Sequence, residues 1–354
     1  TAQPARGADA YPAPSTIQPA DVVGAYPAPM HTRTPMALRF PFVAPGAAPL
    51  LGVPQMAAAQ AAPASAAFVT AQGDQLMLDG KPYHFLGVNA TYLTLTYFLD
   101  SQVEPVIAYL AQTQGVNVIR LFFTPGQDPN RLQSVLDLGN KYGMRYIVAL
   151  QNYHYNKSQS WFAQRYKEQD LPHLRETVTR FRDRPEILMW EMMNEPSCGP
   201  ENGSRQCVDH MYNWAQAVSQ EIRQLDPNHL ISAGMTLRGW TSNEKKNYER
   251  IHALPSVDVV SIHRRAGKTS RGEMRVAENT NKPVFVGEIY YQAYNDQCRP
   301  RNSTILQKRA DYIAKDLQWS FQHGLDGYLL WQHDPGEIPV LGDDKQWFCE
   351  ANSY

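Results

Sequence analysis

The sequence predicts an α/β fold in which eight strands alternate with helices and close into a parallel (β/α)8 TIM barrel. Two observations lead to this prediction. From Phe68 onward, short β-branched or apolar runs alternate with longer segments in which apolar residues recur at three- and four-residue steps. The length of 354 residues also suffices for one domain of barrel size plus an appendage.

The appendage is predicted at the N-terminus, where the composition differs from the rest of the chain. Residues 1–67 are dominated by Ala and Pro and repeat the letters AYPAP at 10–14 and 25–29. Such a composition favours extended, polyproline-like chain without a core of its own and is typical of a linker. We therefore divide the chain into an extension, 1–67, and the predicted barrel, 68–354; the extension is either a linker or a segment that wraps over the barrel.

Eight strands are expected from the apolar and β-branched runs, and helical patterns fall between them. The expected strands are 83–88, 116–122, 145–150, 187–190, 230–232, 257–262, 284–286 and 327–330. The helical patterns include 103–114, 131–141, 171–181, 208–225 and 304–323. Strands and helices in this alternation favour a closed parallel barrel over a doubly wound sheet.

The segment after the last strand is too irregular for the usual eighth helix. Residues 332–354 carry Pro335, Gly336, Pro339 and Gly342 and show no helical period. We expect the eighth helix to be short or missing, with part of the N-terminal extension covering the surface that it would have covered.

Composition excludes several classes of partner. Lys and Arg number 33 against 34 Asp and Glu, a net charge of -1, which indicates neither nucleic acid nor a membrane surface as a partner. No apolar run reaches the length of about 18 residues that a membrane span needs. The chain begins at Thr1 rather than Met, as processed proteins do, and we expect a monomer.

The four cysteines indicate an oxidising compartment. All of them lie in loop segments flanked by Gly, Pro or Asn, and their number is even. The natural pairs are Cys198 with Cys207 and Cys298 with Cys349, which would make the protein secreted or periplasmic. The alternative is four free thiols in a cytosolic enzyme; a zinc site is disfavoured because no CxxC or HxxxH spacing occurs.

Polar and aromatic side chains follow almost every expected strand. In barrels of this type reactive residues lie at the carboxyl ends of the strands, so these positions are the candidates for a site. They are Asn89, Tyr92, Arg120, Asn152, His154, Asn194, Glu195, His263, Glu288, Trp331 and His333. Polar groups at so many strand ends indicate a shared function.

Two of these residues, Glu195 and Glu288, supply the carboxylates that glycoside hydrolysis needs. A retaining mechanism uses two carboxyl groups about 5 Å apart on opposite sides of the glycosidic bond. Strands four and seven stand across the mouth of an eight-stranded barrel, so the two side chains would face each other there. An isolated loop Glu is usually a solvated surface charge, but both of these follow strands that look buried.

The segments around these two residues resemble family 5 glycoside hydrolases. The strand-four signature reads WEMMNEP at 190–196, and the strand-seven segment reads VGEIY at 286–290. Further similarity runs through LDGKPYHFLGVNATYL, GVNVIRLFF and LDPNHLISAG, and the first of these together with NEPSCG is most like endo-β-mannanases. The resemblance covers about 68–331 and implies a TIM barrel, a retaining double displacement, and neither a metal nor an organic cofactor.

The resemblance also implies roles for single residues. Glu195 matches the acid/base, Glu288 the nucleophile, and Asn194 the side chain that binds the sugar 2-hydroxyl. Arg120 matches an arginine that keeps the nucleophile ionised, although a structural salt bridge would also explain a buried arginine.

Four further positions are predicted to contact substrate. His263 matches a histidine that lines the site, and Trp331 matches the platform under the sugar. Asn89 and His154 follow the first and third strands; for His154 a satisfied loop histidine is an equal alternative.

One departure from the family pattern concerns the nucleophile's partner. Family members commonly carry a tyrosine two positions after the strand-six histidine, whereas this chain reads His263, Arg264, Arg265. The tyrosine would have to be Tyr290 or Tyr92, or the role is vacant. The same loop is basic through Arg264, Arg265, Lys268, Arg271 and Arg275. It would either bind an acidic polysaccharide or form an ordinary solvated helix and loop.

The sequence therefore predicts a secreted, retaining endo-β-glycosidase with β-mannan as the first substrate and β-glucan as the second. An enzyme that depolymerises an acidic or unusual exopolysaccharide is the alternative that the basic loop suggests. A transglycosylase would use the same covalent intermediate. A non-catalytic carbohydrate-binding barrel is disfavoured because both Glu residues are present.

Overall fold

The computed structural model describes residues 66–95, 98, 100–152, 157–236, 241–265, 270–290, 303–331 and 333, with the side chains of Pro200, Arg265, Tyr290 and 303–310 left undescribed. Three predictions lie outside the described residues: the course of the N-terminal extension, the fate of the eighth helix, and the pairing of Cys298 with Cys349.

Eight parallel strands form the barrel, as predicted. They are β4 (Phe85–Asn89), β5 (Val118–Phe122), β6 (Arg145–Ala149), β7 (Ile187–Glu191), β8 (Leu230–Ser232), β9 (Val260–Arg265), β10 (Val284–Tyr290) and β11 (Gly327–Leu330). Their order in the sheet is β8-β7-β6-β5-β4-β11-β10-β9. A parallel bridge between Ser232 and Val259, with the Asp258 N–H donating to Ile231 O at 2.9 Å, joins β8 to the chain that enters β9 and completes the ring.

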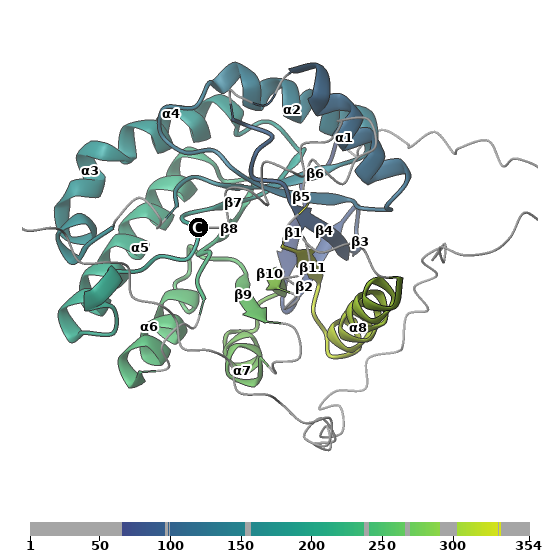
Figure 1. Ribbon diagram of the computed structural model, residues 1–354. Coiled ribbons are helices and arrows are strands. Elements are labelled where there is room, and N and C mark those ends of the chain that lie inside the picture. Colours follow the sequence, from purple (N-terminus) through teal and green to yellow (C-terminus); the bar gives the residue numbers. More distant parts are fainter. Residues whose placement is uncertain are drawn as a thin grey trace, which may run out of the picture. The chain divides into compact units, whose positions relative to one another are not determined.

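Helices surround the strands (Figure 1). They are α1 (Asp100–Gln112), α2 (Pro129–Tyr142), α3 (Tyr166–Gln169), α4 (Leu171–Phe181), α5 (Arg205–Leu225), α6 (Ser242–His252), α7 (Arg271–Thr280) and α8 (Ser303–Gln322). Local chemistry fixes their ends: α6 begins with a capping box between Thr241 and Glu244, and α2 ends at Gly143 in the left-handed conformation. Within the described residues no helix is long and apolar enough to cross a membrane.

A small three-stranded sheet that the sequence did not predict closes the amino-terminal end of the barrel. It consists of β1 (Thr70–Gln72), β2 (Gln75–Leu78) and β3 (Lys81–Pro82), which pair antiparallel. Val69 and Leu76 pack into the cluster that fills the barrel interior, together with Phe85, Phe285 and Leu329. This end is therefore sealed, and the carboxyl ends of the strands are left for a site.

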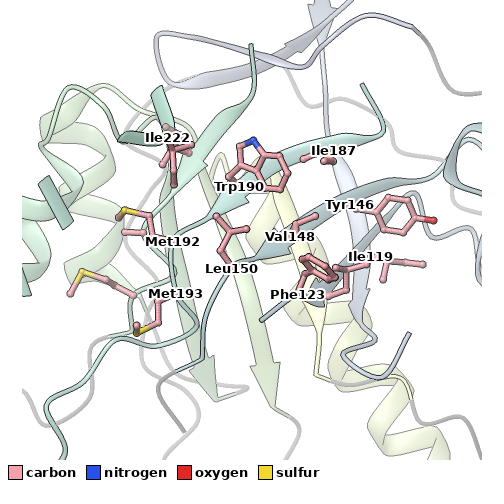
Figure 2. Packing of buried hydrophobic residues seen from close by; sticks show 14 of the residues in the cluster. Ile119, Phe123, Tyr146, Val148, Leu150, Ile187, Trp190, Met192, Met193 and Ile222 are labelled. Carbon is pink, nitrogen blue, oxygen red and sulfur yellow. The ribbon is translucent and has the colours of Figure 1, made fainter. Parts of the chain in front are cut away.

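A second, larger apolar layer lies between the strands and the helices. Figure 2 shows part of it, with Trp190 of β7 near Val148, Leu150 and Ile222 of α5. The indole N–H of Trp190 donates to Asp226 Oδ2 at 2.7 Å, so burial of this ring leaves its polar atom satisfied. Burying an aromatic ring of this size stabilises the fold by roughly 2–3 kcal/mol, which fixes β7 against α5.

Candidate active site

Glu195 lies in the segment that follows β7, and its backbone conformation is unusual. Its φ is 47°, in the left-handed region that residues other than glycine seldom adopt. The Asn194 N–H donates to Gln151 O and the Glu195 N–H donates to Gly234 O, both at 2.8 Å. Strained conformations of this kind persist where the surroundings over-determine them, which is common at active sites.

Gly234, which follows β8, allows this close approach. It has a φ of +65°, and a Cβ atom there would lie 2.0 Å from Met193 O and 2.8 Å from the Glu191 side chain. No side chain larger than hydrogen fits in that space. The position of Glu195 therefore depends on a glycine that follows the neighbouring strand.

Glu288 lies in β10, where the pairing of the sheet is interrupted. Val286 pairs with Ile262 and Glu288 pairs with His263, so Gly287 is an extra residue in β10. A bulge of this kind re-aims the side chains around it. A Cβ atom at Gly287 would lie 2.9 Å from His263 Nε2, so the ring packs directly against the glycine backbone.

The two carboxyl groups meet around His263. Its Nδ1 lies 3.1 Å from Glu195 Oε1 and 3.6 Å from Glu288 Oε1. One nitrogen or oxygen from each of the three buried residues lies within 4.8 Å of the other two. Retaining enzymes place their carboxyl groups about 5–5.5 Å apart, whereas inverting enzymes need about 6.5–9.5 Å to admit a water. The observed closeness fits double displacement.

The same three residues are also of the types that bind metal ions. Arg120 Nη1, however, lies 2.6 Å from Glu288 Oε1, so a cation would sit beside a buried guanidinium and be repelled by it. The arrangement suits an acid and a nucleophile better than a cation.

Arg120 is fully buried and is the central hydrogen-bond donor of the site. Besides Glu288, it donates to Glu191 Oε1 at 2.5 Å, to Asn89 Oδ1 at 2.8 Å and to Asn194 Oδ1 at 2.7 Å. Burial alone would lower the pKa of Arg120, but the charges of Glu191 and Glu288 outweigh burial and raise it. Arg120 is therefore a permanent positive charge that joins β4, β5, β7 and β10.

Glu191 was not predicted as part of the site, although it is completely buried beside Arg120. The predicted strand ended at residue 190, one residue before it. The signal that could have revealed it is physical: a buried arginine needs a carboxylate partner, and Glu191 ends an otherwise apolar strand. Arg120 thus serves as both a structural ion-pair partner and a contact of Glu288.

Asn89 connects three strands at the floor of the site. Its Nδ2 donates to Gly287 O at 2.9 Å and to Leu330 O at 3.2 Å, while its Oδ1 accepts from Arg120. Asn194 is similarly engaged, because its Nδ2 donates to Asn152 Oδ1 at 3.2 Å. These contacts give Asn89 a role in holding the guanidinium and the β10 bulge.

Two aromatic rings lie together at the mouth of the barrel. The Trp331 and Phe122 ring centroids are 6.4 Å apart, and the Arg120 guanidinium carbon lies 5.1 Å from the Phe122 ring centroid. Both rings are half-buried. The sequence singled out Trp331 but not Phe122, which reads as a routine strand residue. Phe122 lies two positions after Arg120 in β5, so both side chains point to the same face of the strand, toward the site.

Of the two tyrosines considered as partners of the nucleophile, Tyr92 and Tyr290, the structure describes the side chain of Tyr92. Tyr92 forms a hydrogen bond between its hydroxyl and His333 Nδ1, at 2.6 Å, and both residues are buried. His154 and the side chain of Tyr290 lie outside the description, so their predicted substrate contacts stay predictions.

Arg264 is not available to an acidic substrate, which corrects one part of the basic-loop prediction. Its guanidinium forms two hydrogen bonds to Asp316, each of 2.9 Å, and the residue is buried. Arg271 and Arg275 are exposed along α7, as expected of a solvated helix face.

The predicted disulfide between Cys198 and Cys207 is confirmed, with a Cα–Cα distance of 6.2 Å. Cys198 lies three residues after Glu195, and Cys207 lies in the first turn of α5. The bond therefore ties the segment that follows Glu195 to a helix anchored in the core.

Comparison with known proteins shows the family of the chain. Residues 76–325 match the family described as Cellulase (glycosyl hydrolase family 5). The probable mannan endo-1,4-beta-mannosidase F of Aspergillus flavus is 24% identical over 355 residues, covering 81% of this chain and 73% of the relative. The mannan endo-1,4-beta-mannosidase A of Podospora anserina is 25% identical over 324 residues, covering 76% and 83%.

Solved structures agree on the fold. The endo-1,4-beta-mannanase from Rhizomucor miehei has a TM-score of 0.60 and 20% identity, over 75% of this chain and 90% of that one. The family match spans well over half of the sequence and includes both Glu195 and Glu288. The chain therefore belongs to glycosyl hydrolase family 5 and is a glycoside hydrolase.

Proposed function

We propose that the protein is a retaining endo-β-mannanase that cleaves β-1,4-linked mannan by double displacement. Glu288 acts as the nucleophile and Glu195 as the acid/base. The observation that carries the proposal is the closeness of the two buried carboxyl groups around His263, with Arg120 bound to Glu288. The names of the fungal relatives support mannan as the substrate.

In the first step, a carboxylate oxygen of Glu288 attacks the anomeric carbon. The glycosidic C–O bond breaks, and the carboxyl group of Glu195 gives its proton to the leaving oxygen. Arg120 supports this assignment because a guanidinium stabilises the charged form of the group that must attack. The product of the step is a covalent glycosyl ester on Glu288.

In the second step, a water molecule attacks the anomeric carbon from the face that the leaving group vacated. Glu195, now ionised, takes the proton from this water, and Glu288 leaves as a carboxylate. His263 lies beside both carboxyl groups and is positioned to hold them as the charge passes from one to the other. The sugar keeps its original anomeric configuration.

The test uses Glu288→Ala and Glu195→Ala with a panel of defined polysaccharides and sizing of the products. We expect release of mannooligosaccharides by the wild-type protein and losses of activity of about 10⁴-fold or more in the variants, in line with removal of essential catalytic groups. With an activated aryl mannoside, whose leaving group departs without a proton, azide should attack the glycosyl-enzyme of Glu195→Ala to give a β-glycosyl azide. In Glu288→Ala, azide should take the place of the missing nucleophile and give an α-glycosyl azide. The opposite anomers would exchange the two roles, and near-normal activity of either variant would reject the assignment.

β-Glucan is the second candidate substrate, since the matched family carries the description Cellulase. The same panel decides between the two polymers. An acidic polysaccharide has less support, because Arg264 is engaged with Asp316.

We also propose that the enzyme is secreted and acts as a monomer. The Cys198–Cys207 disulfide supports an oxidising compartment. Activity in the culture medium of the source organism and a monomeric mass in solution are the expected observations.

A further inference from the structure

The strand that carries Glu288 is irregularly paired around the nucleophile. Val286 pairs with Tyr328 of β11 and Ile289 pairs with Leu330, so two residues of β10 face a single residue of β11. Toward β9, Glu288 pairs with His263 and Gly287 alone is the extra residue. Backbone pairing therefore constrains the segment around Gly287 and Glu288 less than a regular strand would be constrained.

A buried polar cluster, here called the brace, consists of Arg264, Asp316, Ser320 and Tyr328. Arg264 Nη1 and Nη2 donate to the two oxygens of Asp316 at 2.9 Å each, and Nη2 also donates to Ser320 Oγ at 3.1 Å. The Tyr328 hydroxyl donates to Asp316 Oδ2 at 2.8 Å. Bidentate Arg–carboxylate contacts of this kind fix geometry as well as charge.

The brace lies on the outer side of the sheet, behind the bulge. Arg264 directly follows His263, whose ring faces the carboxyl pair, and successive side chains of a strand point to opposite faces. Arg264 pairs with Ile289, and Tyr328 pairs with Val286, so the two residues bracket Gly287 and Glu288 from the strands on either side.

Helix α8 supplies the rigid part of the brace. Asp316 and Ser320 are one helical turn apart, and Ser320 Oγ donates back to Asp316 O at 2.7 Å. The Arg264 guanidinium carbon also lies 5.8 Å from the Trp319 ring centroid. Burial, reinforced by the Asp316 charge, raises the pKa of Tyr328, so its hydroxyl keeps the proton that it donates.

We propose that the brace positions the nucleophile, an inference that rests on the proposed function. By joining β9 and β11 through Asp316 of α8, the brace fixes the bulge that aims Glu288 and holds His263 beside it. Its members act on Glu288 through the strands that they hold.

The test compares two ion pairs that both join a helix to the sheet. Asp316→Asn and Tyr328→Phe weaken the brace. The control, Asp258→Asn, weakens the Arg223–Asp258 pair, which lies where the chain enters β9, at the other end of the strand from Glu288. For each variant we would measure the thermal midpoint, kcat, KM and the rate of covalent labelling of Glu288 by a 2-deoxy-2-fluoro mannoside.

We expect Asp316→Asn to lower kcat and the labelling rate together by about 10- to 100-fold, since small misplacements of a reacting group cost this much. KM should change by less than about threefold, and Tyr328→Phe should give a smaller loss in the same direction. Asp258→Asn should lower the thermal midpoint while kcat and the labelling rate stay near those of the wild type.

Two outcomes would overturn the inference. One is wild-type kcat in folded Asp316→Asn and Tyr328→Phe proteins; the other is an equal loss of kcat in Asp258→Asn. If Asp316→Asn does not fold, the triple variant Arg264→Met, Asp316→Leu, Tyr328→Phe replaces the cluster with apolar side chains, and full activity in that protein would also reject the brace. Failure of the proposed function is distinguishable, because Glu288→Ala would then keep activity or the fluorosugar would not label Glu288.

Discussion

The two carboxyl groups of the site are held in different ways. Glu288 lies within a strand, and its side chain is bound by the permanent charge of Arg120 at 2.6 Å. Glu195 lies after a strand, in a left-handed conformation fixed by backbone hydrogen bonds, and its carboxyl group faces the titratable ring of His263 at 3.1 Å. The nucleophile side thus has a fixed charge, while the acid/base side has a fixed backbone and a histidine ring as its nearest partner.

Substitution of Arg120 should give the largest effect, because it disturbs the contacts that hold the nucleophile Glu288. Lysine keeps the charge but cannot reproduce four simultaneous contacts, so we expect Arg120→Lys to lower kcat by about 100-fold or more. Arg120→Met would leave Glu191 and Glu288 buried without a counter-ion and destabilise the fold by about 3–5 kcal/mol. Steady-state kinetics and thermal unfolding measure the two losses.

The control for Arg120 is Arg175→Lys, which alters a largely exposed pair with Glu221 on the protein surface. It should change neither activity nor stability by more than about 0.5 kcal/mol. Wild-type kcat in Arg120→Lys would contradict the fixed-charge description of Glu288.

Gly234→Ala should displace the acid/base Glu195 by moving its backbone. The new methyl group would lie 2.0 Å from Met193 O, so the segment that carries Glu195 must move. We expect a destabilisation of about 2–4 kcal/mol, with more activity lost on substrates with poor leaving groups than on activated aryl glycosides. Gly115→Ala is the matched control, because Gly115 has the same φ of +65° but open space around it.

Gly115→Ala should cost only the conformational penalty of about 1 kcal/mol and leave kcat unchanged. Equal effects of the two substitutions would mean that the close approach of Gly234 does not position Glu195. A Gly234→Ala loss that is independent of the leaving group would point to a general disturbance of the site.

Much of the fold, and the places of Glu195 and Glu288 in it, could be predicted from the sequence, because periodicity and strand-end position are local signals. The strands Leu230–Ser232 and Gly327–Leu330 and the helix Leu171–Phe181 have the predicted bounds. β10 was predicted to end at Val286 but continues to Tyr290, since the bulge hides the alternation that marks a strand. The strands β1–β3 are only two to four residues long, and β1 and β3 are exposed, so their apolar pattern is too short to signal a sheet.

Long-range partners could not be predicted. Arg264 reads as one member of a basic run, and nothing local connects it to Asp316, 52 positions later. Glu191 was similarly hidden, because its partner Arg120 lies 71 positions earlier. Tertiary structure decides which charges are paired and buried, and thereby which arginines a substrate can reach.

Activity at low pH depends both on unfolding of the protein and on the state of the two catalytic carboxyl groups. Substitution of His252 separates the two effects, because His252 contributes to acid unfolding. Burial lowers the pKa of His252 to about 4, and its Nδ1 lies 2.9 Å from Tyr248 O. Because the unfolded histidine titrates near 6.5, the unfolded state binds more protons between pH 6.5 and 4, and stability falls across that window as the pH drops. The loss is about 3 kcal/mol for a shift of this size.

His252→Gln should therefore remove about 3 kcal/mol of pH dependence between pH 6.5 and 4, as measured by urea unfolding at several pH values. It would be less stable than the wild type at pH 7, because a packed ring is lost. If its stability fell with acid as steeply as that of the wild type, the pH dependence would come from other groups. The acid limb of its activity profile then reports the catalytic pair with less interference from unfolding.

Phe122 should give the smallest effect, because it lies beside the carboxyl pair rather than within it. Its ring stands next to Trp331, so we expect Phe122→Leu to raise KM by roughly 2- to 10-fold with little change in kcat, as loss of an aromatic contact would. Phe123→Leu is the matched control: the adjacent ring is buried in the outer apolar layer, and its truncation should lower stability while KM stays constant. A fall in kcat for Phe122→Leu would instead show that the ring supports Arg120, and would place Phe122 on the nucleophile side of the comparison.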